Sequence, residues 1–316
     1  MIDFLKASIH PLAFPKEASE AIEWQMVVNE RTGEISPWQE YYFGSMKAKG
    51  FFPAAGSPTR IILSGSIHKH QQGGANWKPF DFRQLLEGLI SISDHLGVSP
   101  HEIQLENLEA GANVRTSHRA QEILKGAFLH RSTPFEAMLS DRKYGVVATK
   151  SEFRDKLYAK GRQYTKEIET ANEAQDTDPE KLIRWERHYS KMRQLNQMGI
   201  STFADLANPS RLSKLRHKIE ESLNEVLFVP QEKEARSEVG TWNKEWTNPR
   251  YFISLSRENP QQFRRERTKL NNRLQDAGLV HWAQTSDEIR NELRAICYPS
   301  LKDAKMANHW ASSSSY

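Results

Sequence analysis

Residues 153–164 alternate in side-chain character with a period of two, which is the period of a β-strand. In an extended strand, successive side chains point to opposite faces. One face would carry Phe153, Asp155, Leu157, Ala159, Gly161 and Gln163. The other would carry Arg154, Lys156, Tyr158, Lys160, Arg162 and Tyr164. The segment therefore predicts a half-buried strand with a basic, exposed face that contains tyrosine.

A tyrosine hydroxyl among cations on one exposed face suits attack on a phosphodiester. The deprotonated phenol is a nucleophile, and nearby positive charge stabilises both the phenolate and the charge that builds on the phosphate. A strand with a solvated basic edge gives the same pattern without any chemistry. The interpretation therefore depends on the rest of the chain.

The bulk composition is that of a soluble chain of one to three domains with enough residues for a sizeable core. Of the 316 residues, 38% are hydrophobic and 27% charged, and the mean hydropathy is −0.71. No apolar run approaches the ~18 residues of a membrane span, and no secretory signal is evident. The single cysteine, Cys297, excludes an internal disulfide and a multi-cysteine zinc site. We expect a cytoplasmic protein, and the net charge of +4 weakly favours a polyanionic partner.

The order of periodic segments predicts an α+β fold with a mainly antiparallel sheet and packed helices. A hairpin is expected over 21–43 around a turn at 29–34, and an amphipathic helix over 81–96 between Asp81 and Gly97. Further strands are expected over 60–70, 102–115, 153–164 and 182–188. The period becomes helical over 189–228.

We expect two domains, a catalytic one over 1–230 and a basic helical region over 250–316, joined by a charged linker. In the second, Ser286, Asp287 and Glu288 are expected to cap a helix that runs to Cys297. A cationic cluster precedes that helix and is suited to phosphate contacts, although a solvated helix face has the same composition. Its members are Arg264, Arg265, Arg267, Lys269 and Arg273.

Two polar groups on the expected strands are candidates for metal binding and catalysis. His68 and His70 would share one strand face and could ligate a divalent metal ion, with Glu109 completing the site if its strand pairs with theirs. Arg184, Glu186 and His188 would share a face of the strand at 182–188. Surface histidines and a surface ion-pair row are the alternative interpretations.

Five segments, in order, resemble the gene II protein family of filamentous phages, replication endonucleases with relatives among plasmid initiators. The resemblance covers about 61–206, roughly half of the chain. The segments are Ile62–Gly74 with Ser66-x-x-Lys69, Leu105–Glu109, Leu157-Tyr158-Ala159-Lys160 with Gln163, Leu182-Ile183-Arg184-Trp185-Glu186, and Arg193-Gln194-Leu195 through Leu206.

The resemblance implies an enzyme that nicks and rejoins one strand at an origin to start rolling-circle replication. Tyr158 takes the place of the catalytic tyrosine, which would become joined to the 5′ side of the nick and free a 3′-OH. Glu109 takes the acidic place, whereas Asn107 stands where the family has arginine. Lys160 would orient the phosphate, and Arg184 and Glu186 would complete the site.

The implied cofactor is Mg²⁺ or Mn²⁺, held by Glu109 with Glu186 as a further candidate ligand and, from the residues alone, by His68 and His70. The implied partners are double- and single-stranded origin DNA, with a host helicase and polymerase in a bacterial cytoplasm.

Two rival functions remain open. One is a non-catalytic DNA-binding or copy-control protein, and the other is a hydrolytic nuclease that uses Glu109 and Glu186 with metal. Within the first interpretation, Tyr144 or Tyr164 is a possible second nucleophile.

Overall fold

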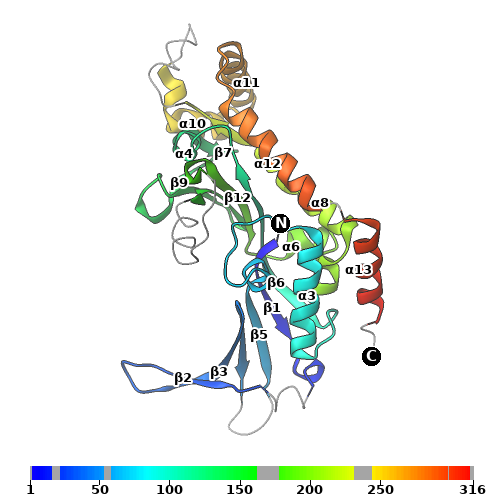
Figure 1. Cartoon of the computed structure of the whole chain (residues 1–316). Coiled ribbons are helices and arrows are strands. Elements are labelled where there is room, and N and C mark those ends of the chain that lie inside the picture. The colour runs from blue at the N-terminus through cyan, green and yellow to red at the C-terminus, as the bar shows by residue number, and fades with distance from the viewer. Residues whose placement is uncertain are drawn as a thin grey trace. The chain divides into compact units, whose positions relative to one another are not determined.

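The computed structural model describes residues 2–15, 22–52, 58–161, 178–230, 244–297 and 299–313. The fold is mixed α+β, as the sequence predicts, with a ten-stranded antiparallel sheet, packed helices and a helical C-terminal region (Figure 1). In sheet order, the ten strands are β2 (Gln25–Val28), β3 (Ile35–Phe43), β4 (Met46–Phe51), β5 (Arg60–Ser66), β1 (Ile2–Ile9), β6 (Ile103–Arg115), β12 (Leu182–Tyr189), β11 (Phe153–Ala159), β10 (Gly145–Thr149) and β9 (Glu136–Ala137).

A smaller sheet contains three strands, in the order β13 (Val226–Phe228), β7 (Ala127–His130) and β8 (Thr133–Pro134). The helices are α2 (Ile67–Gln71), α3 (Phe82–Leu96), α4 (Ala120–Gly126), α6 (Arg193–Gln197), α7 (Phe203–Leu206), α8 (Pro209–Leu223), α10 (Pro249–Glu258), α11 (Pro260–Asp276), α12 (His281–Cys297) and α13 (Leu301–Ser313). Within the described residues, no helix combines the length and apolar character needed to cross a bilayer.

The chain divides into two compact units that differ from the expected division at 230–250. Unit 1 comprises residues 1–111, 188–217 and 294–316, and unit 2 comprises residues 112–187 and 218–293. Each unit is therefore assembled from separate stretches of sequence. The boundaries between the units fall within β6, α8, β12 and α12, so each of these elements contributes residues to both units.

In unit 1, β1 lies between β5 and β6 and pairs with both in antiparallel fashion. Its Leu5, Ala7 and Ile9 are fully buried, since alternate side chains of a strand share one face. The helix α3 contacts α2 and α13 and buries its own apolar stripe, Phe82, Leu85, Leu86, Leu89, Ile92 and Leu96. The hairpin expected over 21–43 is confirmed as β2 and β3 (Figure 1).

In unit 2, β10 and β11 pair with Gly145 opposite Tyr158. A β-carbon at position 145 would lie 2.5 Å from Cβ of Tyr158, so glycine allows this close approach. A second hydrophobic cluster lies around Phe252 of α10 and Leu270 of α11. The indole N–H of Trp246 donates a hydrogen bond to Glu266 there, 3.1 Å long, which satisfies a buried polar group.

Several expected boundaries are wrong. The strand expected over 60–70 ends at Ser66, whose side chain accepts a hydrogen bond from the backbone of Lys69 and caps α2. In the segment expected to be helical to 228, α8 ends at Leu223 and β13 follows. The helix expected to start at 286–288 begins at His281.

The prediction for α3 is confirmed at both ends. Asp81 accepts a hydrogen bond from the backbone of Gln84, and the Gln84 side chain accepts one from the backbone of Asp81, which is a capping box. Gly97 ends the helix with a φ of 62°, in the left-handed region that favours glycine.

We predict that Asp81→Ala lowers the free energy of unfolding by about 1 kcal/mol, because the first turn of α3 loses its capping group. Asp81→Ser should keep most of that stability, since serine also caps helices. Urea denaturation followed by circular dichroism measures both variants. Equal losses in the two would show that the side-chain cap contributes little.

Candidate functional site

The candidate site lies in unit 2, where the side chain of Glu186 from β12 accepts hydrogen bonds from two residues of β11. The Tyr158 hydroxyl donates to Oε2 at 3.2 Å, and Lys156 Nζ donates to Oε1 at 2.7 Å. Tyr158 and Lys156 are two residues apart and so share a strand face. Because β11 and β12 are neighbours in the sheet, that face brings a phenol and an ammonium group to one carboxylate.

Arg184 completes the site from β12 itself. Its Nε donates to Oε2 of Glu186 at 2.9 Å, and its Nη1 donates to Oδ1 of Asn113 on β6 at 3.1 Å. Glu186 and Arg184 are each only 2% exposed, whereas Tyr158 and Lys156 are half-buried. A carboxylate at such depth is costly unless it is paired, and here both of its oxygens accept hydrogen bonds from cationic side chains.

The alternative interpretation of Arg184, Glu186 and His188 as a surface ion-pair row is wrong, because every residue of β12 is buried. The predicted alternation is correct, but the face it defines is turned into the protein. This difference changes the energetics. An exposed ion pair contributes little, whereas removing one partner of a buried pair leaves an uncompensated charge.

The arrangement has the parts needed for nucleophilic chemistry. The Tyr158 hydroxyl donates a hydrogen bond to a carboxylate, as a nucleophile does to the group that takes its proton. Lys156 and Arg184 lie on the same carboxylate and provide positive charge next to the phenol. Such a site suits an anionic substrate, because fixed cations stabilise charge that develops during the reaction.

The other faces of β11 and β12 carry a second buried ion pair, between Asp155 and Arg187. Arg187 donates from Nε to Oδ1 at 2.6 Å and from Nη2 to Oδ2 at 2.9 Å, in a bidentate arrangement. Nε2 of His130, on β7, lies 3.3 Å from Oδ2 of Asp155 and 3.2 Å from the backbone oxygen of Ser222. The side chains of Asp155, Arg187 and His130 are all buried, so this group supports the sheet from inside.

A pair of carboxylates in unit 1 is the candidate for metal binding. Asp3 and Glu109 offer oxygen atoms that lie within 4.8 Å of one another. Nδ1 of His188 lies 2.8 Å from Oε1 of Glu109, while Asp3 accepts hydrogen bonds from Ser66 and Asn76. Carboxylate oxygens are the ligands that Mg²⁺ and Mn²⁺ prefer, so the donor set fits the expected ion.

The expectation that His68 and His70 share a strand face is wrong, because both lie on α2. On a helix, residues i and i+2 point in different directions. Nε2 of His68 contacts Gln72 at 3.0 Å, and Nε2 of His70 contacts Ser91 at 3.3 Å. Burial also lowers the pKa of His70.

The condition for Glu109 to complete that site, that its strand pairs with the histidine strand, is not met either. In the sheet, β1 lies between β5 and β6, so the strand of Glu109 has β1 as its neighbour on that side. Among the described residues, neither His68 nor His70 belongs to a group of three potential metal ligands.

Lys160 does not lie on an exposed basic face as expected. The strand ends at Ala159, Lys160 is in the turn that follows, and its side chain is only 1% exposed. Strand alternation therefore stops before it. Tyr144 precedes β10 and is 40% exposed, with Lys143 Nζ 5.2 Å from its ring centre. The expectations for Arg162 and Tyr164 fall outside the described residues.

Three residues of the two clusters were not assigned a role from the sequence. Lys156 lies on the basic face that alternation predicts over 153–164, and Asn113 lies on the strand expected over 102–115. Asp3 belongs to an apolar N-terminal segment, and its neighbour Glu109 is about a hundred residues away in the chain. Strand order joins them, and no local pattern records it.

Comparison with known proteins adds no assignment: no protein-family model matches the chain, and no curated protein matches it.

We predict that the free energy of unfolding decreases as the pH is lowered, because of the buried side chain of His130. Burial lowers the pKa of His130 to about 4, and the opposing effect of Asp155 is smaller. Between about pH 6.5 and pH 4, the unfolded chain binds a proton that the folded chain does not, so the free energy of unfolding falls as pH falls, by up to about 3 kcal/mol. Urea titrations at several pH values measure this loss.

The comparison variant is His130→Asn, whose unfolding free energy should depend less on pH over the same interval. His309→Gln, which removes an exposed histidine, should behave as the wild type. The same pH dependence in wild type and His130→Asn would contradict the assignment.

Proposed function

We propose that this chain is a DNA-nicking and rejoining enzyme that uses Tyr158 as its nucleophile and serves rolling-circle replication. The observation that carries the proposal is the 3.2 Å hydrogen bond from the Tyr158 hydroxyl to Glu186, with Lys156 and Arg184 on the same carboxylate. The ordered resemblance to the gene II protein family supports the choice of DNA as substrate. The pI of about 9.0 is consistent with a polyanionic partner.

The proposed reaction begins with attack of Tyr158 Oη on a phosphodiester phosphorus. The O–P bond to tyrosine forms, the bond from phosphorus to the 3′ oxygen breaks, and that oxygen takes up a proton to become a 3′-OH. Glu186 receives the phenol proton as the bond forms. Lys156 and Arg184 stabilise the negative charge on the phosphate oxygens.

Rejoining reverses these bonds. A 3′-OH attacks the phosphotyrosyl phosphorus, the phosphate passes back to the 3′ oxygen, and Tyr158 recovers its proton. Such a covalent intermediate conserves the energy of the broken bond, so rejoining needs no nucleotide cofactor.

Asp3 and Glu109 are the residues proposed to hold Mg²⁺ or Mn²⁺. A bound divalent cation supplies Lewis-acid stabilisation of phosphate charge. His188 would then orient Glu109 through the 2.8 Å contact, as partners behind a metal ligand commonly do.

A second candidate function is favoured by the completeness of the Glu186 network. The same contacts would satisfy a buried carboxylate in a protein that binds DNA and does not cut it. In that case, the cluster is structural and the hydroxyl of Tyr158 is dispensable for every activity.

We predict that Tyr158→Phe abolishes a covalent protein–DNA adduct that the wild type forms. The test incubates each protein with Mg²⁺ or Mn²⁺ and end-labelled single-stranded DNA from the origin region of the element that encodes it, followed by a denaturing gel. Tyr144→Phe, which removes the hydroxyl of a partly exposed tyrosine in the same unit, is the matched control and should keep the adduct. Glu186→Gln should slow adduct formation about 100-fold, since it removes the proton acceptor.

An adduct that persists in Tyr158→Phe and disappears in Tyr144→Phe would move the nucleophile. Nicking without an adduct would favour a hydrolytic nuclease, and neither nick nor adduct would favour the DNA-binding alternative.

We also predict that Asp3→Asn and Glu109→Gln each weaken Mn²⁺ binding by about tenfold or more. Residues that only orient a metal ligand commonly contribute about tenfold to affinity, so loss of a ligand itself should cost at least as much. Electron paramagnetic resonance of free Mn²⁺ measures the affinity directly. Glu106→Gln is the control, because Glu106 lies on the same strand and pairs with Lys6 and Arg60. An equal loss in all three variants would indicate general electrostatics.

A further inference from the structure

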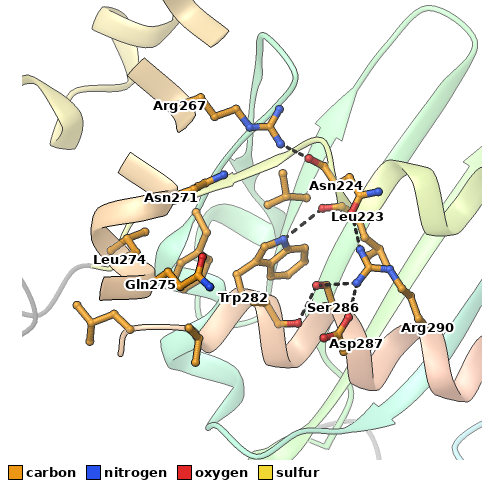
Figure 2. Close-up of a pocket in the computed structure, with 15 residues that line it drawn as sticks. Leu223, Asn224, Arg267, Asn271, Leu274, Gln275, Trp282, Ser286, Asp287 and Arg290 are labelled. Carbon is orange, nitrogen blue, oxygen red and sulfur yellow. Dashed lines mark hydrogen bonds and ion pairs between the residues drawn. The ribbon is translucent and has the colours of Figure 1, made fainter. Parts of the chain in front are cut away.

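Unit 2 contains a cavity that the proposed reaction does not use. It has a volume of about 380 Å³ and lies between the end of α8, β13, α11 and the first turns of α12 (Figure 2). That volume is within the range of small-ligand sites in proteins. Its lining combines two aromatic rings, two guanidinium groups and three side-chain amides, a combination suited to a ligand that is both flat and anionic.

The aromatic part of the cavity is Trp282, which occupies its centre in Figure 2. The indole N–H donates to the backbone oxygen of Leu223 at 3.2 Å, and Phe228 stacks on the ring with centres 6.2 Å apart and planes 12° apart. Trp185 packs against it from β12 at 5.9 Å. Trp282 remains partly exposed while these contacts fix its orientation, so it provides a rigid surface for stacking.

The cationic part comes from Arg267 on α11 and Arg290 on α12. Arg267 donates a hydrogen bond to the backbone oxygen of Asn224, and burial lowers the pKa of its guanidinium. Arg290 is held by Asp287 and the side chain of Asn224 (Figure 2). A guanidinium group carries five donors, so each arginine keeps the capacity to bind phosphate oxygens beside its protein contacts.

Polar groups that can form hydrogen bonds with the edge of a flat ligand lie on α11 beside the indole. Asn271 and Gln275 line the cavity and are exposed, and each side-chain amide offers both donors and an acceptor. The edges of nucleobases carry the matching donors and acceptors. Asp287 is the acidic residue of the lining, and Arg290 neutralises it in an ion pair.

This cavity is distinct from the Tyr158 site within the same unit. Trp185, which packs on Trp282, alternates along β12 with Arg184 and Glu186. Because neighbouring residues of a strand point to opposite faces, Trp185 and the tyrosine site belong to opposite faces of the sheet. A ligand in the cavity would therefore not contact the reacting hydroxyl.

We propose that this cavity binds one nucleoside phosphate unit of a single-stranded nucleic acid, with the base against Trp282 and the phosphate on Arg267 and Arg290. Base stacking on a fixed aromatic ring is the usual way in which proteins hold unpaired bases, and paired bases cannot enter a cavity of this kind. The choice of nucleic acid rests on the chemistry of the cavity and is independent of the role proposed for Tyr158.

The test measures binding of a fluorescein-labelled oligonucleotide of twelve thymidines by anisotropy, with all variants made in a Tyr158→Phe background to exclude covalent capture. Ala283 lines the cavity on the first turn of α12 and is exposed. Ala283→Glu places a negative charge in the cavity, where the helix N-terminus favours it, whereas Ala283→Lys places a positive charge of similar length there. Arg267→Gln is compared with Arg265→Gln, which removes an exposed charge from the same helix.

We expect Ala283→Glu and Arg267→Gln to weaken oligonucleotide binding about tenfold or more, with unchanged thermal unfolding midpoints, since each removes or opposes a phosphate contact. Ala283→Lys and Arg265→Gln should stay within about twofold of the parent. Thymidine monophosphate should compete with the oligonucleotide, whereas inorganic phosphate should not. Competition by short strands but not by the mononucleotide would show that the cavity binds the nucleoside phosphate only as part of a strand.

Three results would overturn the proposal. They are absence of binding by the parent, equal losses in Arg265→Gln and Arg267→Gln, or unchanged binding by Ala283→Glu. Competition by inorganic phosphate as strong as that by the mononucleotide would reduce the cavity to a simple anion site and reject a role for the base.

Discussion

The buried carboxylate of Glu186 is the constraint on which the centre of unit 2 depends. A carboxylate removed from water must be paired with donors, and its partners come from two strands, with Lys156 and Tyr158 on β11 and Arg184 on β12. Arg184 in turn engages Asn113 of β6. One charge therefore sets the side-chain directions of three neighbouring strands, and the same contacts place a phenol beside a proton acceptor.

Ion pairs on both faces also fix the register of β11 against β12. Glu186 pairs with Lys156 on one face, and Arg187 pairs with Asp155 on the other. A slip of one residue would move Asp155 to the face of Glu186 and leave both arginine and carboxylate without their partners. Hydrophobic contacts alone tolerate such errors more readily than buried charges do, so the position of Tyr158 follows from electrostatics as much as from packing.

Much of the fold and part of the site could be predicted from local pattern. Alternation located β11 and β12, a strand was expected where β6 lies, and helical spacing with Asp81 and Gly97 located α3. The failures lie where tertiary structure decides. Ser66 caps a helix that the preceding apolar run does not predict. Lys160 is buried because β11 ends at the residue before it. Asp3 meets Glu109 through strand order, which no short segment encodes.

The role of Tyr158 can be separated from the stability of its surroundings. Lys156 and Arg184 together more than offset the single negative charge of Glu186, and both of its oxygens accept hydrogen bonds from them. The hydroxyl of Tyr158 is neutral and adds a third contact at 3.2 Å, longer than the other two. A phenol half-buried beside an acceptor and two cations, on a carboxylate that is already paired, is consistent with the nucleophile proposed above. In the structural alternative, a phenylalanine would serve at this position as well.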